Sequence, residues 1–565
     1  MQTRLTCLLL TLVACAGNED NGGLDTDASG APDADTDTDT DDTDTLPDPQ
    51  ATLVAGGAVS CAETTRTTTS WFVKRSVESA PDTDEMFPAE PWVWGSGLVV
   101  ADFDDDGLTD IFAANEAQPA FFRNNGVGLD DVAPAVFLGT DVTYSSGGSA
   151  ADYDGDGDLD LLITRYMHPN VLMQNLGAGQ FQDVTAAVGL PTEGRRSMSS
   201  AWGDYDRDGD LDLYIGNYGF VDESIPSEYF LPAEADWFLR NDAGVFTDLS
   251  ATIPVEVHDG YSYAVAWIDL DDNGFPDLYT VNDFGTAYPN KLLWNEGGVL
   301  TLDGNASGLD GPWTGMGLDF ADINGDGVAD LYQPVWNNHV LLESLSTPDG
   351  PLWLESSGSR LLDNDLTRDQ KVAWGGDFGD LDNDGDEDLL VQFGWVEVGT
   401  GENWGNALRQ PDAVYLMDAT GKYTDSAPAL GMDDMGIGRG GVLADFNNDG
   451  FLDVVKRDVS GSSIAYLSMC DTNAWTRIRL HGVAPNTFAI GAKVRVTAGG
   501  KVQTNWVRAG GLSLGSSGPP EAHFGLGLAD TIDRIEIVWP DGRVSLFADV
   551  ASRQILDVTQ LPPTL

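Results

Sequence analysis

Basic side chains and histidines are scarce in this chain. Its 565 residues include 28 lysines and arginines and five histidines against 92 aspartates and glutamates, which gives a formal net charge of −64. Nucleic-acid binding depends on clustered basic side chains that neutralise phosphates. The composition therefore excludes a nucleic-acid partner and points to metal cations or basic partners.

Sequence signals of catalysis are also missing. There is no Cys-x-x-Cys pair, no Gly-x-Ser-x-Gly elbow and no phosphate-binding loop. The five histidines show no metal-ligand spacing; they are His168, His258, His339, His481 and His523. Carboxylates are abundant enough that counting leaves a glycosidase pair open, but nearly every clustered aspartate belongs to a repeated loop. We expect a protein that is not an enzyme.

No apolar run long enough to cross a membrane follows the first residues. Residues 1–15 combine one positive charge, a short apolar run and small residues before Cys15, which is typical of a signal peptide. The end of this segment, Leu12-Val13-Ala14-Cys15, resembles the bacterial lipobox. The resemblance implies cleavage before Cys15 and a lipid on that cysteine. The alternative is an ordinary signal peptide with a chance cysteine.

Residues 16–60 form an acidic segment rich in Asp and Thr, without apolar periodicity. Such a segment buries no core, so we expect a disordered tether that holds the body away from a membrane. A solvated tail without a role is the alternative. Together, the two segments predict a secreted protein at the cell surface or outer membrane, attached to the membrane only through a lipid anchor.

A nine-residue pattern, Asp-x-Asp/Asn-x-Asp/Asn-Gly-x-x-Asp, occurs seven times at intervals of 50 to 65 residues. Calcium takes six to eight oxygen ligands, and alternate acidic side chains of a curled loop supply them, with glycine at position 6 permitting the curl. We therefore expect up to seven calcium ions, held by positions 1, 3, 5 and 9 of loops 1 to 7. These residues are Asp102, Asp104, Asp106 and Asp110; Asp152, Asp154, Asp156 and Asp160; Asp204, Asp206, Asp208 and Asp212; Asp269, Asp271, Asn273 and Asp277; Asp322, Asn324, Asp326 and Asp330; Asp380, Asp382, Asp384 and Asp388; and Asp445, Asn447, Asp449 and Asp453.

These loops are not EF-hand loops. An EF-hand needs a glutamate at position 12 and a helix on each side. Position 12 holds no glutamate in any copy, and the flanking segments, such as LDLLIT and GLVVADF, read as short strands. Each unit contains two more apolar segments around an Asn/Gly turn, which makes four strands a unit. Seven such units predict an all-β, seven-bladed β-propeller over residues 61–470.

The ring is expected to close with residues from its beginning. The last unit lacks a fourth strand, and SWFVKRSVES before loop 1 reads as a strand without a blade. We therefore predict that residues near Trp71 to Ser79 complete the last blade. Cys61 and Cys470 stand at the two ends of the repeats, and a disulfide between them would latch the ring in an oxidising compartment; spacing alone leaves this pairing open.

The loops resemble the FG-GAP/VCBS repeats of integrin α-subunit propellers. The stretches AIGAKVRVTAGG, GGLSLGSSGPPEAHFGLG and IDRIEIVWPDGRV in residues 471–565 resemble the ASPIC/UnbV domain. Together they resemble the cartilage acidic protein family and its bacterial relatives. His523 lies in one of these stretches, where a structural role is favoured. The loops with Asn273, Asn324 or Asn447 depart from the all-Asp pattern and should bind calcium more weakly.

The C-terminal residues 471–565 carry nine basic and eight acidic side chains, so the acidic excess ends at the boundary. Alternation in KVRVTA and RIEIVW predicts a small antiparallel β unit.

The resemblance implies adhesion or protein–protein contact. We expect a monomeric scaffold in which calcium rigidifies the blades and one loop face binds a surface protein or glycan. A polysaccharide-active enzyme and a purely structural surface protein are the alternatives. Four tryptophans precede loops in similar places, where blade packing is favoured over a sugar-stacking ring; they are Trp202, Trp267, Trp313 and Trp374.

Overall fold

The computed structural model describes most of the chain beyond its N-terminal region. The described residues are 50–58, 66, 72–77, 97–219, 233–258, 260–336, 338–347, 350–362, 371–395, 409–459 and 463–563. Nearly all regular structure in these ranges is β-strand, with short α-helices at Ala133–Val136 (α1), Val255–His258 (α2) and Ala427–Leu430 (α3) and a 3-10 helix at Ser250–Thr252. None of the helices in these ranges is long and apolar enough to cross a membrane.

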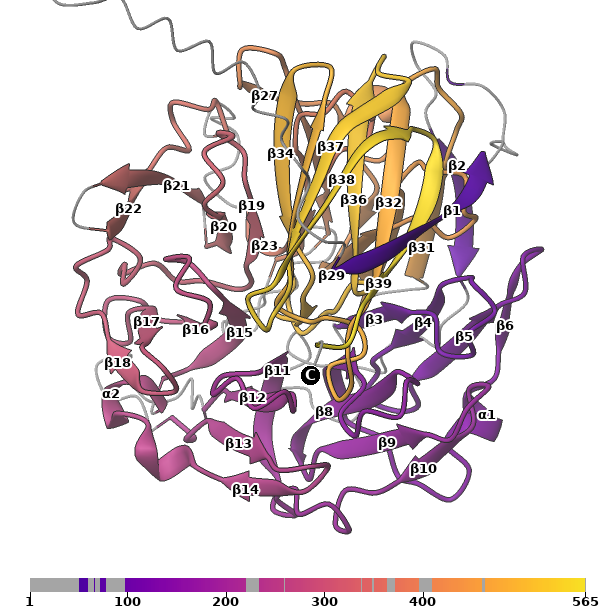
Figure 1. Cartoon of the computed structure of the whole chain (residues 1–565). Coiled ribbons are helices and arrows are strands. Elements are labelled where there is room, and N and C mark those ends of the chain that lie inside the picture. Colours follow the sequence, from indigo (N-terminus) through magenta and orange to yellow (C-terminus); the bar gives the residue numbers. More distant parts are fainter. Residues whose placement is uncertain are drawn as a thin grey trace, which may run out of the picture. The chain divides into compact units, whose positions relative to one another are not determined.

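The described residues of the repeat region form seven four-stranded units, the blades, arranged as a β-propeller (Figure 1). Blades 1 to 4 are β3 (Leu98–Ala101), β4 (Asp110–Ala113), β5 (Ala120–Asn124) and β6 (Leu129–Asp131); β7 (Ser145–Ala151), β8 (Asp160–His168), β9 (Val171–Asn175) and β10 (Phe181–Asp183); β11 (Arg195–Gly203), β12 (Asp212–Asn217), β13 (Trp237–Asn241) and β14 (Phe246–Asp248); and β15 (Ser262–Ile268), β16 (Asp277–Asn282), β17 (Lys291–Asn295) and β18 (Leu300–Leu302). Blades 5 to 7 are β19 (Asp319–Ala321), β20 (Asp330–Val335), β21 (Asn338–Thr347) and β22 (Gly350–Glu355); β23 (Ala373–Gly379), β24 (Asp388–Phe393), β26 (Ala413–Met417) and β27 (Tyr423–Asp425); and β29 (Gly438–Ala444), β30 (Asp453–Asp458), β31 (Ser463–Ser468) and β2 (Phe72–Val77).

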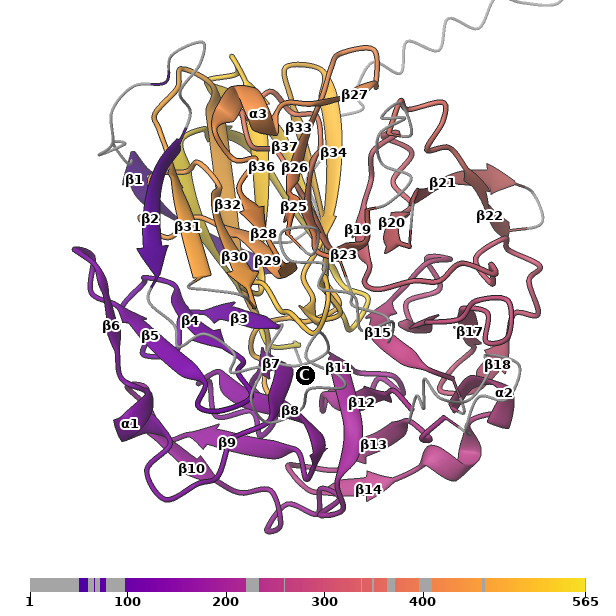
Figure 2. The ribbon, with the colours of Figure 1, turned by 180° about the vertical axis from the view of Figure 1, so that it is seen from behind.

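Strand β2 confirms the predicted closure of the ring. It pairs antiparallel with β31, from Phe72 opposite Ser468 to Val77 opposite Ser463, and the two strands lie side by side in Figure 2. A second closing contact joins the first and last blades, because Asn124 Nδ2 donates a hydrogen bond of 2.8 Å to the Phe446 carbonyl. Cys470 is disulfide-bonded; the predicted partner Cys61 lies outside the described residues, so the pairing stays a prediction.

The C-terminal domain consists of two four-stranded sheets. One holds β1 (Ala51–Ala58), β39 (Gln554–Gln560), β32 (Ala474–His481) and β36 (Glu521–Gly527); the other holds β34 (Lys501–Trp506), β33 (Lys493–Ala498), β37 (Thr531–Val538) and β38 (Val544–Ala551). The second sheet confirms the antiparallel unit predicted from KVRVTA and RIEIVW, because β33 pairs antiparallel with β34 and β37. In the first sheet, β32 and β39 run parallel. Buried residues of both sheets, among them Val496 and Phe524, share one apolar cluster with Trp202 and Leu213 of blade 3.

Strand β1 (Ala51–Ala58) corrects the predicted end of the tether. It pairs antiparallel with β39, so residues 51–58 are part of the C-terminal domain and not of a disordered spacer (Figure 1). The physical reason is local: the acidic run ends at Asp48, and ATLVAGGA carries no charge that would oppose pairing. The remainder of the predicted tether, and Cys15, lie outside the described residues.

A loop of the C-terminal domain enters the propeller. Residues 509–518, here named the plug loop, include β35 (Ala509–Gly510), which pairs with β11 in blade 3. Further backbone hydrogen bonds of 2.8 to 3.1 Å reach blades 1, 2 and 5: Ser517 N to Leu98 O, Val100 N to Ser517 O, Gly148 N to Gly515 O, and Ser513 N to Leu318 O. One loop therefore ties together the innermost strands of blades on different sides of the ring.

Glycine makes this close approach possible. A Cβ atom at Gly147 would lie 2.2 Å from the carbonyl oxygen of Gly515, and one at Gly97 would lie 2.1 Å from the same atom. Since real Cβ contacts are not that short, no other residue fits either position with the plug loop in place.

Candidate metal centres in the Asp-rich loops

All seven loops share one backbone scaffold. The position 1 carboxylate accepts a hydrogen bond of 2.5 to 3.1 Å from the N–H of the position 6 glycine in every copy. The residue at position 4 and the glycine at position 6 both have positive φ, for example 58° at Arg207 and 102° at Gly209. Glycine adopts this conformation without strain. The curl therefore brings position 3 back toward position 1. The third member of the acidic group is position 5 in loop 1 and position 9 in loops 2, 3, 4 and 6.

The aspartate at position 9 ties the loop to two strands, a role that sequence reasoning missed. One of its oxygens accepts the N–H of position 2, at 2.9 to 3.3 Å. The other accepts a backbone N–H of the blade's third strand, at 2.6 to 2.9 Å. Burial raises the pKa of these groups, to about 7 for Asp110 and about 9 for Asp212. Position 9 is thus a structural residue as well as a potential ligand.

An asparagine on the third strand joins neighbouring loops. Asn175 Nδ2 donates 2.8 Å to the carbonyl of Phe103 in loop 1, and Asn241 and Asn295 reach loops 2 and 3 in the same way. The recurrent Asn in QNL, RND and WNE is the sequence signal for this contact, although from sequence it is predicted only as part of a turn.

Five loops bring three acidic side chains close enough to hold one cation. In each, one carboxylate oxygen from every residue lies within 4.8 Å of the other two. The groups are Asp102, Asp104 and Asp106; Asp152, Asp154 and Asp160; Asp204, Asp206 and Asp212; Asp269, Asp271 and Asp277; and Asp380, Asp382 and Asp388. Oxygen-rich groups of this kind could hold a divalent ion such as calcium.

Orphaned oxygens in loops 1 to 3 show that these residues fit a metal ion. The Oδ1 atoms of Asp102, Asp104, Asp154, Asp204 and Asp206 are buried and accept no hydrogen bond. A buried carboxylate oxygen without a partner is costly. A bound cation would satisfy all of these atoms, and it would also offset the burial that raises the pKa of Asp204 to about 7.

Loops 5 and 7 are not among the five acidic groups found in the described residues. In loop 5, Asn324 directs its amide toward the acids, since Nδ2 donates 3.2 Å to Asp330 and 3.1 Å to the carbonyl of Ser344. Ser344 Oγ in turn donates 3.1 Å to Asp326. Loop 4 also contains an asparagine, Asn273, and is nevertheless among the five.

The C-terminal domain contacts all seven loops. Lys493 pairs with Asp272 of loop 4 at 2.7 Å, Lys501 with Asp386 of loop 6, and Arg477 with Asp445 of loop 7 at 3.0 Å. The remaining four contacts are Arg479 Nη2 to Gly107 O in loop 1, Thr487 Oγ1 to Asp152 in loop 2, Pro485 against Gly209 in loop 3 and Arg495 against Gly327 in loop 5. The face that carries the candidate metal centres is therefore an interface within the molecule.

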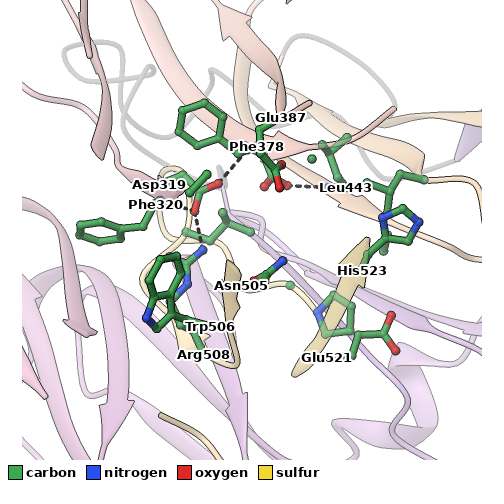
Figure 3. A pocket seen from close by; sticks show the side chains of 18 of the residues that line it. Asp319, Phe320, Phe378, Glu387, Leu443, Asn505, Trp506, Arg508, Glu521 and His523 are labelled. Atoms are coloured by element: carbon green, nitrogen blue, oxygen red, sulfur yellow. Dashed lines mark hydrogen bonds and ion pairs between the residues drawn. The ribbon is translucent and has the colours of Figure 1, made fainter. Parts of the chain in front are cut away.

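A cavity of about 120 Å³ lies beside the plug loop (Figure 3). Asp319 accepts the backbone N–H of Phe378 at 2.7 Å and Arg508 Nη2 at 2.6 Å. Asp377 accepts the N–H of Leu443 at 2.6 Å, and burial together with the neighbouring Asp319 raises the pKa of Asp377 well above its usual range. Each carboxyl thus links its blade to the next.

The histidines and tryptophans singled out above are mostly structural. His339 lies between the hydroxyls of Tyr332 and Tyr415, at 2.6 and 3.1 Å, and His523 Nε2 lies 3.1 Å from the Gly450 carbonyl. Trp202, Trp267 and Trp374 are buried, which favours blade packing over a sugar-stacking ring.

The fold and loops define a β-propeller protein with FG-GAP-like repeats. The FG-GAP-like repeat family matches residues 102–163, 152–215 and 269–332, and the ASPIC and UnbV family matches residues 482–563. Its relatives include cartilage acidic protein 1 of Mus musculus, 26% identical over 84% of this chain and 75% of the relative, and that of Homo sapiens, 25% identical over 84% and 73%. The chain is thus a distant homologue of cartilage acidic protein 1.

Two solved structures give weaker likenesses. One is an Agrocybe aegerita lectin described as recognising non-reducing terminal N-acetylglucosamine, with 15% identity, a TM-score of 0.39 and coverage of 65% of this chain and 92% of that chain. The other is BBS1N in complex with ARL6DN, with 12% identity, a TM-score of 0.39 and coverage of 72% and 99%.

Proposed function

We propose that this protein is a calcium-binding scaffold that presents a binding surface for a protein or glycan at the cell surface, and that it is not an enzyme. The observation that best supports this proposal is the position of the loops that could hold a metal ion. They underlie the C-terminal domain, and loops 1 to 3 hold buried carboxylate oxygens without partners. Calcium, when bound, would neutralise these carboxylates and fix the loops against the domain.

The expected stabilisation is large. Extracellular calcium sites have dissociation constants of about 0.1–1 mM, and the tighter end of that range gives about 2 kcal/mol per site at about 2 mM calcium. Five sites then contribute about 9 kcal/mol, comparable with the net stability of a domain, about 5–15 kcal/mol. Calcium would thus decide whether propeller and C-terminal domain act as one rigid body.

A location outside the cell is part of the proposal. It rests on residues 1–15 and on the acidic segment that follows, and extracellular calcium concentrations suit sites of this affinity. Labelling the expressed protein with a lipid precursor, with Cys15→Ser as the control, tests the lipid anchor.

Binding is tested by capture from cell-surface extracts on the immobilised protein, in calcium and in EDTA. Proteins or glycans retained only in calcium support the scaffold proposal. If neither the protein fraction nor the glycan fraction contains a calcium-dependent ligand, the result contradicts the scaffold proposal and favours a purely structural surface protein.

The cavity in Figure 3 is an observation that favours an enzyme, because Asp319, Asp377 and Glu387 line it. Asp319 and Asp377 are already engaged by backbone N–H groups, and ligand pockets are usually about 300–1,000 Å³. A panel of polysaccharides tests this alternative. Release of reducing ends by the wild type, abolished in Asp377→Asn, would establish the enzyme and overturn our proposal.

A further inference from the structure

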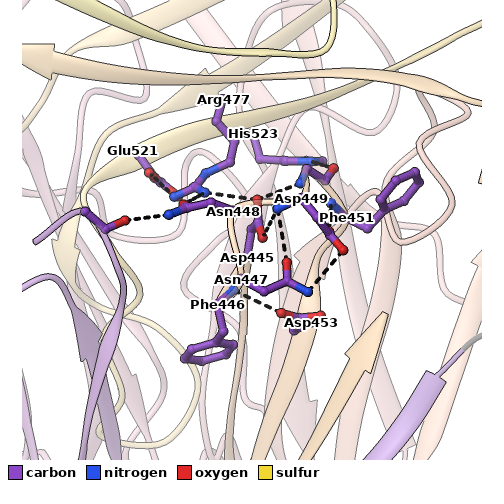
Figure 4. Close-up of polar contacts among 12 residues, drawn as sticks. Asp445, Phe446, Asn447, Asn448, Asp449, Phe451, Asp453, Arg477, Glu521 and His523 are labelled. Atoms are coloured by element: carbon purple, nitrogen blue, oxygen red, sulfur yellow. Dashed lines mark hydrogen bonds and ion pairs between the residues drawn. The ribbon is translucent and has the colours of Figure 1, made fainter. Parts of the chain in front are cut away.

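Loop 7 differs from the other loops in what faces its first aspartate. Figure 4 shows Arg477 of β32 directed at Asp445. Arg477 Nη1 donates 3.0 Å to Asp445 Oδ2 and 2.6 Å to Asn448 Oδ1. The side chains of Arg477 and Asp445 are 2% and 0% exposed, so this ion pair is fully buried.

Arg477 is held in this position by a second acid. Its Nε and Nη2 donate 2.9 and 2.8 Å to the two oxygens of Glu521, a bidentate arrangement that fixes the guanidinium plane. Burial favours the neutral form of a guanidinium, but the two facing carboxylates outweigh it and raise the pKa of Arg477. The positive charge is therefore a permanent part of loop 7.

The oxygens of loop 7 are satisfied without a metal ion. Asp445 Oδ1 accepts the N–H of Asp449 at 3.0 Å, and Asp445 Oδ2 accepts Gly450 N as well as Arg477. Asn447 Nδ2 donates 3.0 Å to Asp449 Oδ2. Within the described residues, none of the ligand-position carboxylate oxygens of loop 7 is left buried without a partner, in contrast to loops 1 to 3.

Other basic residues of the C-terminal domain approach the loops differently. Lys493 pairs with Asp272 at position 4 of loop 4, and Lys501 with Asp386 at position 7 of loop 6. Neither position supplies a carboxylate to the acidic groups of those loops. Among the ion pairs of the described residues, Arg477 alone joins a basic residue of this domain to a position 1 carboxylate.

We infer that the guanidinium of Arg477, bound to the outer oxygen of Asp445, neutralises loop 7 in place of a metal ion. Loop 7 is then a metal-independent anchor for the C-terminal domain, and the other blades take the ions. This inference rests on the proposed calcium binding of those blades. The contact surface around the anchor is close-packed: a Cβ at Gly450 would lie 1.7 Å from Trp475 Cε2.

The test counts calcium bound to the purified full chain by elemental analysis after equilibrium dialysis. Asp204→Asn in loop 3 is expected to lose one ion, whereas the matched Asp445→Asn in loop 7 is expected to lose none. Because Asp445→Asn also removes the partner of Arg477 and its fold is at risk, Asn447→Ala is compared with Asp206→Ala at position 3. We expect no loss for Asn447→Ala and a loss of one ion for Asp206→Ala.

Removal of the guanidinium gives the opposite change. Arg477→Gln is expected to gain one ion, while Arg534→Gln, which removes an exposed arginine of the same domain paired with Glu536, is expected to leave the count unchanged. Loss of one ion in both Asp445→Asn and Asn447→Ala would overturn the inference and leave calcium binding intact. A wild type that binds no calcium at all would overturn the proposed function and this inference together.

Discussion

Loops 3 and 7 have the same backbone conformation but differ in what faces their acidic side chains. Both curl around the N–H of a position 6 glycine, at 3.1 and 2.8 Å from the position 1 carboxylate. Loop 3 buries two carboxylate oxygens without a partner, whereas loop 7 receives the guanidinium of Arg477. The difference teaches that this nonapeptide specifies a shape that concentrates negative charge, and that tertiary structure decides which cation neutralises it.

The largest effect is expected from displacing the plug loop, which pairs with β11 of blade 3 and packs against Val442 of blade 7. Gly147→Val places side-chain atoms on the Gly515 carbonyl and should destabilise the protein by about 3 kcal/mol or more, since overpacking and a displaced loop add together. Thermal unfolding of the calcium-loaded protein measures it. Gly128→Ala, at a glycine with open space, is the control. Equal melting of both variants would mean that the plug loop contributes little.

Arg477→Met breaks the anchor of loop 7. Removing one partner of a buried ion pair typically costs about 3–5 kcal/mol because the other charge is left unpaired. Denaturant unfolding in EDTA isolates this cost from metal binding. Little or no destabilisation relative to wild type in EDTA would show that Arg477 is not the cation of loop 7.

Asp206→Ala in loop 3 is expected to destabilise the protein only when calcium is present. With calcium, the variant loses one site and about 2 kcal/mol; in EDTA it should equal or exceed wild type, because a buried unpaired carboxylate is gone. Unfolding curves in both conditions give the two differences. Destabilisation that is the same with and without calcium would assign Asp206 a purely structural role.

The smallest effect concerns the N-terminal strand. Deletion of residues 51–58 removes an edge strand whose side chains are mostly exposed, so a loss of about 1–2 kcal/mol is expected. Amide hydrogen exchange of β39 checks it, because the freed edge loses its antiparallel partner. Unchanged protection of the Asp557 and Thr559 amides, which face β1, would contradict the pairing.

Much of the fold could be predicted from the sequence, because each repeat is formed by residues that are close together in the chain. Each Asp-Gly-Asp loop and its flanking strands lie within one stretch of sequence, so the seven units and the closing strand β2 could be predicted. Contacts between distant segments could not. The plug loop reads as an ordinary glycine-rich turn, β1 as the end of a polar tail, and nothing in RIRLHG marks Arg477 as a partner of Asp445.

The candidate site was predictable to the same extent. Charge and spacing identify the ligand positions, and the five acidic groups fall on them. The exceptions depend on partners that sequence does not place: the amide of Asn324 directed at Asp330, and the arginine buried in loop 7.

The most direct test of the account is thermal unfolding of the full chain in calcium and in excess EDTA, with the bound ion counted in the same sample. The account predicts a large drop in melting temperature in EDTA and a calcium count of about five to six, with none assigned to loop 7 by the variants above. An unchanged melt and no bound metal would contradict it and would make the loops ordinary acidic turns.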